Sequence, residues 1–159
     1  MADGSIRWGV LGGTSRIYHG RLRPPMVDGA RHHVVAEASR TADGGTQPYT
    51  DLLARNDVDA VYIPLPNVGH KPWILAALEA GKHVLCEKPL TMSSADTDEV
   101  FVAAEAAGRV LMEAYMWPHH PRSRVLLDIA GESLGSLITS YGTFSFPLNR
   151  PDDHRVDER

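Results

Sequence analysis

Five short apolar segments recur along the chain at nearly constant spacing, and this spacing limits the folds that the chain can adopt. Their first residues are 27, 27, 23 and 27 positions apart. Each interval leaves room for one helix, and strands that alternate with helices are typical of βαβ units around a parallel sheet. The segments are mainly apolar and do not alternate with polar residues, as expected of strands that are covered on both faces. The predicted strands are Ile6–Leu11, His33–Ala38, Ala60–Pro64, His83–Glu87 and Val110–Ala114.

Two of the intervals between strands carry clear helix signals. The pattern over residues 70–80 predicts a helix, and Gly81 suits the left-handed position that follows a helix end. A second helix is predicted over residues 94–107, with a serine at position 93 or 94 as its N-cap. Gly108 is expected to end it.

The other connections give weaker patterns. Pro24–Pro25 is expected to cut the first crossover helix to about two turns, because proline lacks the backbone donor. The second crossover is expected to be helical only over Thr50–Arg55. Beyond the fifth strand, Pro121–Ala130 predicts a helix and Leu137–Phe146 predicts a strand with no later partner. The polar residues Asn149–Arg159 predict no further element.

Charge and composition exclude several classes of partner. The chain has 20 acidic and 16 basic side chains and a formal net charge of −4, whereas nucleic-acid binders concentrate positive charge. No apolar run is long enough for a membrane span, and the first residues do not resemble a leader peptide. We therefore expect neither a nucleic-acid nor a membrane partner. The single cysteine, Cys86, is expected to be a small core residue in a reducing cytoplasm.

A glycine-containing loop follows the first strand and is the first candidate binding site. Glycines at a strand-to-helix turn allow close approach of a pyrophosphate, which the N-terminus of the next helix stabilises. The spacing departs from G-x-G-x-x-G, and Tyr18 stands where a small residue would allow close packing. The expected cofactor-binding residues of this loop are Gly12, Gly13, Thr14, Ser15, Arg16 and Ile17.

The end of the second strand predicts which dinucleotide would bind. An acidic residue here would accept a hydrogen bond from a ribose 2′-hydroxyl, whereas Ser39 and Arg40 suit a 2′-phosphate. NADP is therefore favoured over NAD. The alternative is that Arg40 is only a solvated loop residue. Glu37 could compete for the ribose, but the predicted register places it inside the strand.

Three motifs from the third strand onward resemble one oxidoreductase family. They are Pro66-Asn67-x-x-His70, Glu87-Lys88-Pro89 and Glu113-Ala-Tyr-Met-Trp117-Pro-His-His120. In this order they resemble the Gfo/Idh/MocA family, named after glucose-fructose oxidoreductase and inositol dehydrogenase. Within it they look most like the NADP-dependent D-xylose 1-dehydrogenases and the dihydrodiol dehydrogenases.

The resemblance implies a domain organisation. Residues 1–120 would form a Rossmann-like, doubly wound α/β domain that binds a dinucleotide. Residues 121–159 would begin an incomplete α+β domain that serves substrate binding and oligomerisation, and a homo-oligomer is expected through it.

The resemblance also implies an activity and a set of site residues. The activity is hydride transfer from the hydroxyl carbon of a small sugar or diol to NADP, with Lys88 as the catalytic residue. Pro66, Asn67, His70, Glu87 and Lys88 would line the cofactor site. Glu113, Trp117 and His120 would border the substrate cleft. No metal is expected, because the adjacent residues His119 and His120 cannot converge on one ion without further ligands.

Two departures from the family modify these expectations. Family members carry a longer segment between Arg40 and Tyr49. The chain also stops before the family's Asp-x-Gly-Cys-Tyr segment, so impaired turnover is expected of the chain alone. A non-catalytic dinucleotide-binding remnant is the alternative, and a relative that uses a transient redox step for elimination or hydrolysis is a third reading.

Overall fold

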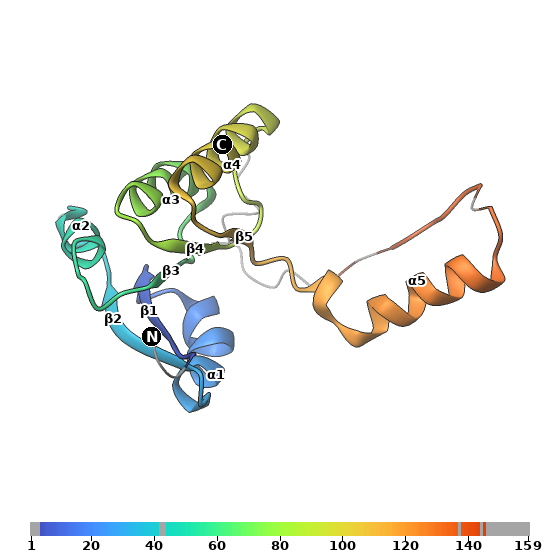
Figure 1. Cartoon of the computed structure of the whole chain (residues 1–159), viewed down its shortest axis with the longest axis horizontal. Helices are drawn as coiled ribbons and strands as arrows, with labels where there is room; N and C mark the ends of the chain where they lie inside the picture. The colour runs from blue at the N-terminus through green and yellow to red at the C-terminus, as the bar shows by residue number, and fades with distance from the viewer. Residues whose placement is uncertain (1–3, 42–43, 137, 144, 146–159) are drawn as a thin grey trace. The chain divides into compact units, whose positions relative to one another are not determined.

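The strands form one parallel sheet of five in the order β2-β1-β3-β4-β5, as the computed structural model shows (Figure 1). The structure describes residues 4–41, 44–136, 138–143 and 145. All five strands predicted to alternate with helices are present, with their ends within one residue of the prediction. The strands are β1 (Ile6–Leu11), β2 (His32–Ala38), β3 (Ala60–Ile63), β4 (His83–Cys86) and β5 (Leu111–Glu113).

Helices cover both faces of the sheet, which confirms the predicted doubly wound α/β fold. All four residues of the central strand β3 are buried. Val61 and Ile63 belong to the larger core cluster, whereas Tyr62 between them belongs to a second cluster with Tyr18 and Met26. This alternation is expected of a strand that packs on both sides.

The two helices with clear signals form as predicted. They are α3 (His70–Glu79) and α4 (Ser94–Ala107). The Ser93 hydroxyl caps α4 by accepting a hydrogen bond from the Asp96 N–H at 3.1 Å. Gly108 ends α4 with a φ of +61°. The local capping residues were therefore sufficient to predict both ends of this helix.

The first crossover is longer than the two prolines suggested, and that prediction was wrong. Residues 16–28 are helical throughout: a π-helical segment, η1 (Tyr18–Leu22), leads directly into α1 (Arg23–Asp28). The N–H of Arg23 donates to the Tyr18 carbonyl, five residues back. Pro24 and Pro25 follow this wider π-helical segment, and the helix continues through both.

The second crossover, which connects β2 to β3, contains a turn and one helix in its described residues. A turn closes when the Thr41 N–H donates to the Gly45 carbonyl at 3.0 Å. α2 (Gln47–Leu53) follows, three residues earlier than predicted, because Pro48 suits its first turn. Tyr49 and Leu52 on this helix join the larger core cluster.

The chain divides into two units, residues 1–116 and residues 117–159. The second unit contains η3 (Trp117–His119) and α5 (Pro121–Ser133), which extends three residues beyond the predicted helix. The strand predicted over 137–146 is not formed in the described residues 138–143 and 145. A strand needs a neighbouring strand for its backbone hydrogen bonds. Residues 149–159 lie outside the described part of the chain.

No helix in the described part of the chain has the length and apolar character required to cross a membrane.

Candidate functional site

The glycine loop after β1 is fastened to the end of β2. The N–H groups of Gly12 and Gly13 both donate to the Ala38 carbonyl, each at 2.8 Å. Gly12 has a φ of +113°, and a Cβ there would lie 3.1 Å from Leu65 Cδ2. Gly12 and Gly13 were predicted to bind the cofactor, and in the structure their N–H groups hold the loop in shape.

The loop passes close to the side chains of β2 before the helix begins. A Cβ at Gly13 would lie 3.2 Å from Glu37 Cβ and 3.4 Å from Ser39 Oγ. The first helical bond runs from the His19 N–H to the Ser15 carbonyl at 3.1 Å. The preceding N–H groups, those of residues 16–18, therefore lie at the helix N-terminus, where backbone donors favour an anion.

Ser39 and Arg40 follow β2 at the same edge of the sheet. The Ser39 hydroxyl accepts a hydrogen bond from the Thr14 N–H at 3.2 Å. Its own O–H remains available to donate to a further acceptor, since a hydroxyl does both. Arg40 is exposed, and its guanidinium carries the positive charge of this edge.

These segments enclose a cleft of about 730 Å³ at the carboxyl ends of β1, β2 and β3. This is the edge at which open parallel sheets bind ligands. Six of the predicted cofactor residues line the cleft: Gly12, Thr14, Ser15, Ser39, Arg40 and Pro66. The other lining residues, which the sequence did not single out, are Thr41, Gly44, Tyr49, Pro64 and Leu65.

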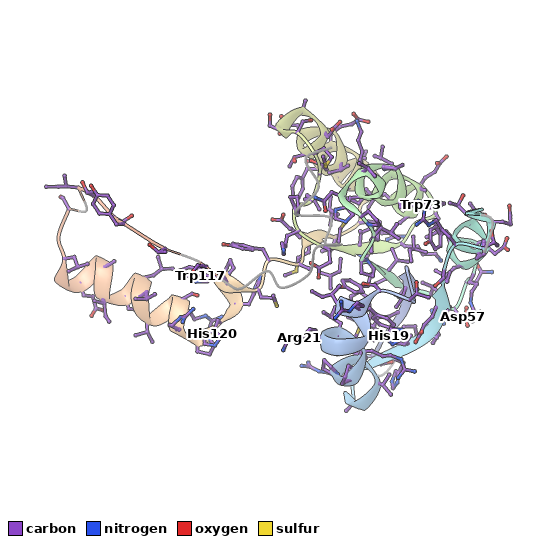
Figure 2. The ribbon with its side chains drawn as sticks, turned by 180° about the vertical axis from the view of Figure 1, so that it is seen from behind. His19, Arg21, Asp57, Trp73, Trp117 and His120 are labelled. Atoms are coloured by element: carbon purple, nitrogen blue, oxygen red, sulfur yellow. The ribbon has the colours of Figure 1, made fainter. Side chains whose placement is uncertain are left out.

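Tyr49 was missed because nothing near it in sequence indicates a site. Its ring packs edge-to-face on Trp73, with centroids 5.0 Å apart, so α2 and α3 meet at this wall. Figure 2 shows Trp73 between these two helices. Pro64 and Leu65 could have been found, because they directly follow a buried strand whose carboxyl end lies at the cleft.

The turn after β4 carries Glu87 and Lys88. Glu87 is buried, and its Oε1 accepts a hydrogen bond from the Tyr62 hydroxyl at 2.7 Å. Burial and this carboxylate raise the pKa of the Tyr62 hydroxyl, so it stays protonated as a donor. Glu87 Oε2 lies 3.3 Å from the Lys88 N–H. Glu87 therefore positions the backbone of Lys88 from inside the fold.

His70 is completely buried, and both ring nitrogens face backbone carbonyls. Nδ1 lies 2.8 Å from the Pro89 oxygen and Nε2 lies 2.9 Å from the Leu65 oxygen. His70 was predicted to line the cofactor site, but both of its ring nitrogens already have backbone partners. His70 connects the loop after β3 to the turn after β4.

Glu113 and Asn67 lie beside these loops. Oε1 of Glu113 accepts a hydrogen bond from the Leu90 N–H at 2.8 Å, which ties the Lys88 turn to β5. Asn67 begins η2 (Asn67–Gly69), a short 3₁₀ turn between β3 and α3, and is half-buried.

The three lysines of the chain differ in their surroundings. Lys71 Nζ lies 2.5 Å from an Asp96 oxygen and 2.7 Å from a Glu99 oxygen. Lys82 is buried, and its Nζ donates to two backbone carbonyls at 2.6 and 3.0 Å. Lys88 is exposed, and no described residue holds its ammonium group. Of the three, it is the lysine most available to a ligand.

Trp117 and His120 belong to the second unit (Figure 2). The Trp117 carbonyl accepts a hydrogen bond from the Ser123 hydroxyl. His120 Nδ1 accepts one from the Arg122 N–H at 3.1 Å, so the ring caps α5. Within the described ranges, no three His, Cys, Asp or Glu side chains form a group that could hold a metal ion.

The site residues from Ser39 to Glu113 fall within a match to a known family model. Residues 26–115 match the model described as "Oxidoreductase family, NAD-binding Rossmann fold", of the Gfo/Idh/MocA group. The chain is 41% identical over 149 residues to D-xylose 1-dehydrogenase (NADP(+)) 2 of Haloferax volcanii, a match that covers 84% of this chain and 45% of that protein. It is 40% identical over 162 residues to dTDP-3,4-didehydro-2,6-dideoxy-alpha-D-glucose 3-reductase of Actinomadura kijaniata, covering 94% of this chain and 48% of that protein.

Solved structures include a close match in fold. The 3-ketoreductase KijD10 of Actinomadura kijaniata, in complex with NADP and TDP-benzene, has a TM-score of 0.72 and 43% sequence identity. The match covers 79% of this chain and 42% of that one. The chain spans about half the length of the curated relatives it matches.

Proposed function

The chain belongs to the Gfo/Idh/MocA oxidoreductase family, with its NAD-binding Rossmann fold, and from this premise we propose that it binds NADP in the cleft at the carboxyl ends of β1–β3. The proposed activity is hydride transfer from the hydroxyl carbon of a small sugar or diol to NADP. The two relatives named above carry NADP(+) and a dTDP-sugar in their names, which supports this class of cofactor and substrate.

The cleft carries the proposal, because its volume and its lining residues fit the cofactor. About 730 Å³ is within the usual range of cofactor and small-molecule pockets. The helix N-terminus at residues 16–18 would hold the pyrophosphate. Arg40 and the Ser39 hydroxyl would hold the 2′-phosphate, since a guanidinium and a hydroxyl both donate to phosphate oxygens. Thr14, Ser15 and Pro66 would line the channel between these groups.

In the proposed reaction, NADP supplies the hydride acceptor and the chain's own residues handle the proton. Removal of a hydride from a hydroxyl-bearing carbon requires loss of the hydroxyl proton. Lys88 would orient that oxygen and take up or relay its proton. The ammonium group of Lys88 has no partner in the described part of the chain, and its backbone is held by Glu87. Glu113 and His70 would act as positioning residues of the same turn.

The proposal extends to domain organisation and setting. Residues 1–120 would form the dinucleotide-binding domain, and residues 121–159 would belong to a substrate and oligomerisation domain. A homo-oligomer would form through the latter. Trp117 and His120 would border the substrate. A reducing cytoplasm is proposed as the setting, and the free, buried thiol of Cys86 supports this setting.

Calorimetric titration of the purified chain with NADP and with NAD tests the cofactor assignment. We expect NADP to bind more tightly than NAD. Equal affinity, or no binding of either, would contradict it. Incubation with NADP and D-xylose then separates the two functional readings: steady NADPH formation supports catalysis, whereas binding without turnover supports a non-catalytic dinucleotide-binding role.

A further inference from the structure

Tyr18, in the helix after the glycine loop, makes a side-chain contact with β2. Its hydroxyl donates to Glu37 Oε1 at 2.6 Å, and the ring is completely buried. The Arg23 Nε lies 3.2 Å from the same carboxylate oxygen. The helix after the glycine loop therefore holds an acidic side chain of β2 with two donors.

Glu37 stands two residues before Ser39, and both side chains approach the same glycine. A Cβ at Gly13 would lie 3.2 Å from Glu37 Cβ and 3.4 Å from Ser39 Oγ. The two side chains therefore leave the backbone on the same side. Ser39 lines the cleft, whereas Glu37 does not. The contact with Tyr18 accounts for this difference between two adjacent positions on one face.

A carboxylate released at this point would change which cofactor the cleft accepts. It would accept a hydrogen bond from a ribose 2′-hydroxyl, as acidic residues near the end of this strand do in NAD-binding sites. The same carboxylate would repel a 2′-phosphate on Ser39 and Arg40, because both groups are negative.

We propose that Tyr18 is a specificity-determining residue that, together with Arg23, holds the Glu37 carboxylate out of the cleft so that a 2′-phosphate is preferred over a 2′-hydroxyl. The inference rests on the proposed binding of NADP and goes beyond it, because it assigns the preference to a buried tyrosine outside the cleft.

The packing around Tyr18 fixes the position of its hydroxyl. The ring belongs to the cluster with Val10, Met26 and Tyr62, and its centroid lies 6.2 Å from that of Tyr62. Burial and the Glu37 carboxylate raise the pKa of the Tyr18 hydroxyl, so it remains a donor at neutral pH. The Glu37 side chain is still 32% exposed, so it has room to move once the donor is removed.

The test compares dissociation constants for NADP and NAD in variants of the full chain, measured by calorimetry. Tyr18→Phe keeps the ring and removes the donor. We expect NADP to bind roughly threefold to fivefold more weakly, the size of one exposed charge contact, with NAD unchanged or tighter. Adding Glu37→Gln to Tyr18→Phe should restore the NADP affinity, because the charge is then gone.

Two further variants separate this effect from loss of packing. Tyr62→Phe removes an equivalent buried Tyr–Glu hydrogen bond in the same cluster, to Glu87 instead of Glu37. It should leave the ratio of the two dissociation constants unchanged. Arg23→Ala is an exposed substitution and should shift the ratio in the same direction as Tyr18→Phe. Adding Glu37→Gln to Arg23→Ala should reverse that shift.

The proposal is overturned if Tyr18→Phe and Arg23→Ala both leave the ratio unchanged in folded protein, or if Glu37→Gln does not reverse their effect. These outcomes differ from a failure of the proposed function, in which the unmodified chain itself would not prefer NADP.

Discussion

The Glu113 carboxylate on β5 accepts a hydrogen bond from the backbone N–H of Leu90, two residues beyond Lys88, at 2.8 Å. This contact ties the turn after β4 to the neighbouring strand. His70 holds the carbonyl of the intervening Pro89 from α3. The backbone on the carboxyl side of Lys88 is therefore held by side chains from two other elements, while Lys88 itself stays exposed.

Glu113→Ala should release the Leu90 amide. A hydrogen bond to a charged group contributes about 1.5–3 kcal/mol, so exchange of this amide with solvent should accelerate roughly 10- to 100-fold. Glu113→Gln keeps an acceptor oxygen and should retain most of the protection. Amide exchange followed by NMR measures both, with the Asp96 amide on Ser93 as an internal reference. Equal exchange of Leu90 in all three proteins would show that the contact does not hold the turn.

Arg40→Ala should weaken NADP binding and spare NAD binding. Loss of a charge-assisted contact to a 2′-phosphate is expected to raise the dissociation constant for NADP roughly 10- to 100-fold. Arg21→Ala is the matched control, because Arg21 is an exposed arginine on η1 that does not line the cleft (Figure 2). Calorimetry decides the matter: a parallel loss of NAD affinity in Arg40→Ala would argue against a 2′-phosphate contact.

Gly12→Ala should destabilise the fold. The φ of +113° disfavours an L side chain, and the new Cβ would lie 3.1 Å from Leu65 Cδ2. A residue in such a backbone region costs on the order of 1–3 kcal/mol of unfolding free energy. Gly20→Ala is the control: it lies in η1, and a Cβ there meets nothing within 4 Å. Urea unfolding should show a lower free energy of unfolding for Gly12→Ala and an unchanged one for Gly20→Ala. Similar free energies for the two variants would contradict the requirement for glycine at position 12.

Asp59→Asn should remove an acid-dependent part of the stability. Arg7 donates to both carboxylate oxygens of Asp59, at 2.9 and 2.6 Å, and holds the pKa of Asp59 at about 2. Because this pKa is below the unfolded value of about 4, the contribution is complete above pH 4 and is lost as the pH falls towards 2. The contribution of this contact to the free energy of unfolding is on the order of 1 kcal/mol, because the Asp59 side chain is 24% exposed and solvent screens the charge.

Urea unfolding at pH 7 and at pH 2.5 measures this difference. The stability gap between the unmodified chain and Asp59→Asn should be largest at pH 7 and should narrow at the lower pH. Asp57→Asn is the matched control, because the Asp57–Arg55 pair is more exposed and should contribute less. A gap that stays constant with pH would rule out ionisation of Asp59 as its source.

Local signals predicted the parts of the fold that depend on neighbours in sequence. The strands and the ends of α3 and α4 follow from apolar runs and capping residues, which act within one turn or one strand. The first crossover was mispredicted because the effect of Pro24 depends on whether the preceding turn widens. The residues before it form a π-helical segment, and the helix continues through both prolines.

The candidate site was predictable where it lies on loops that directly follow strands. Ser39, Arg40 and Pro66 belong to this group and line the cleft. Tyr49 was not predictable, because it reaches the cleft through the packing of α2 on α3. His70 was expected to line the cofactor site, but its ring lies between two backbone carbonyls, that of Leu65 in the preceding loop and that of Pro89 in the turn after β4.

The sequence by itself determined the succession of strands and helices, the glycine loop after the first strand and the family to which the chain belongs. These features depend on residue types at short, regular spacing. Only the tertiary structure decided which polar groups are paired: the Tyr18 hydroxyl with the Glu37 carboxylate, 19 residues apart, and the Leu90 backbone N–H with the Glu113 carboxylate, 23 residues apart. Such pairs depend on which faces of distant elements are packed together, and a hydrogen bond forms only when packing brings both groups within about 3 Å.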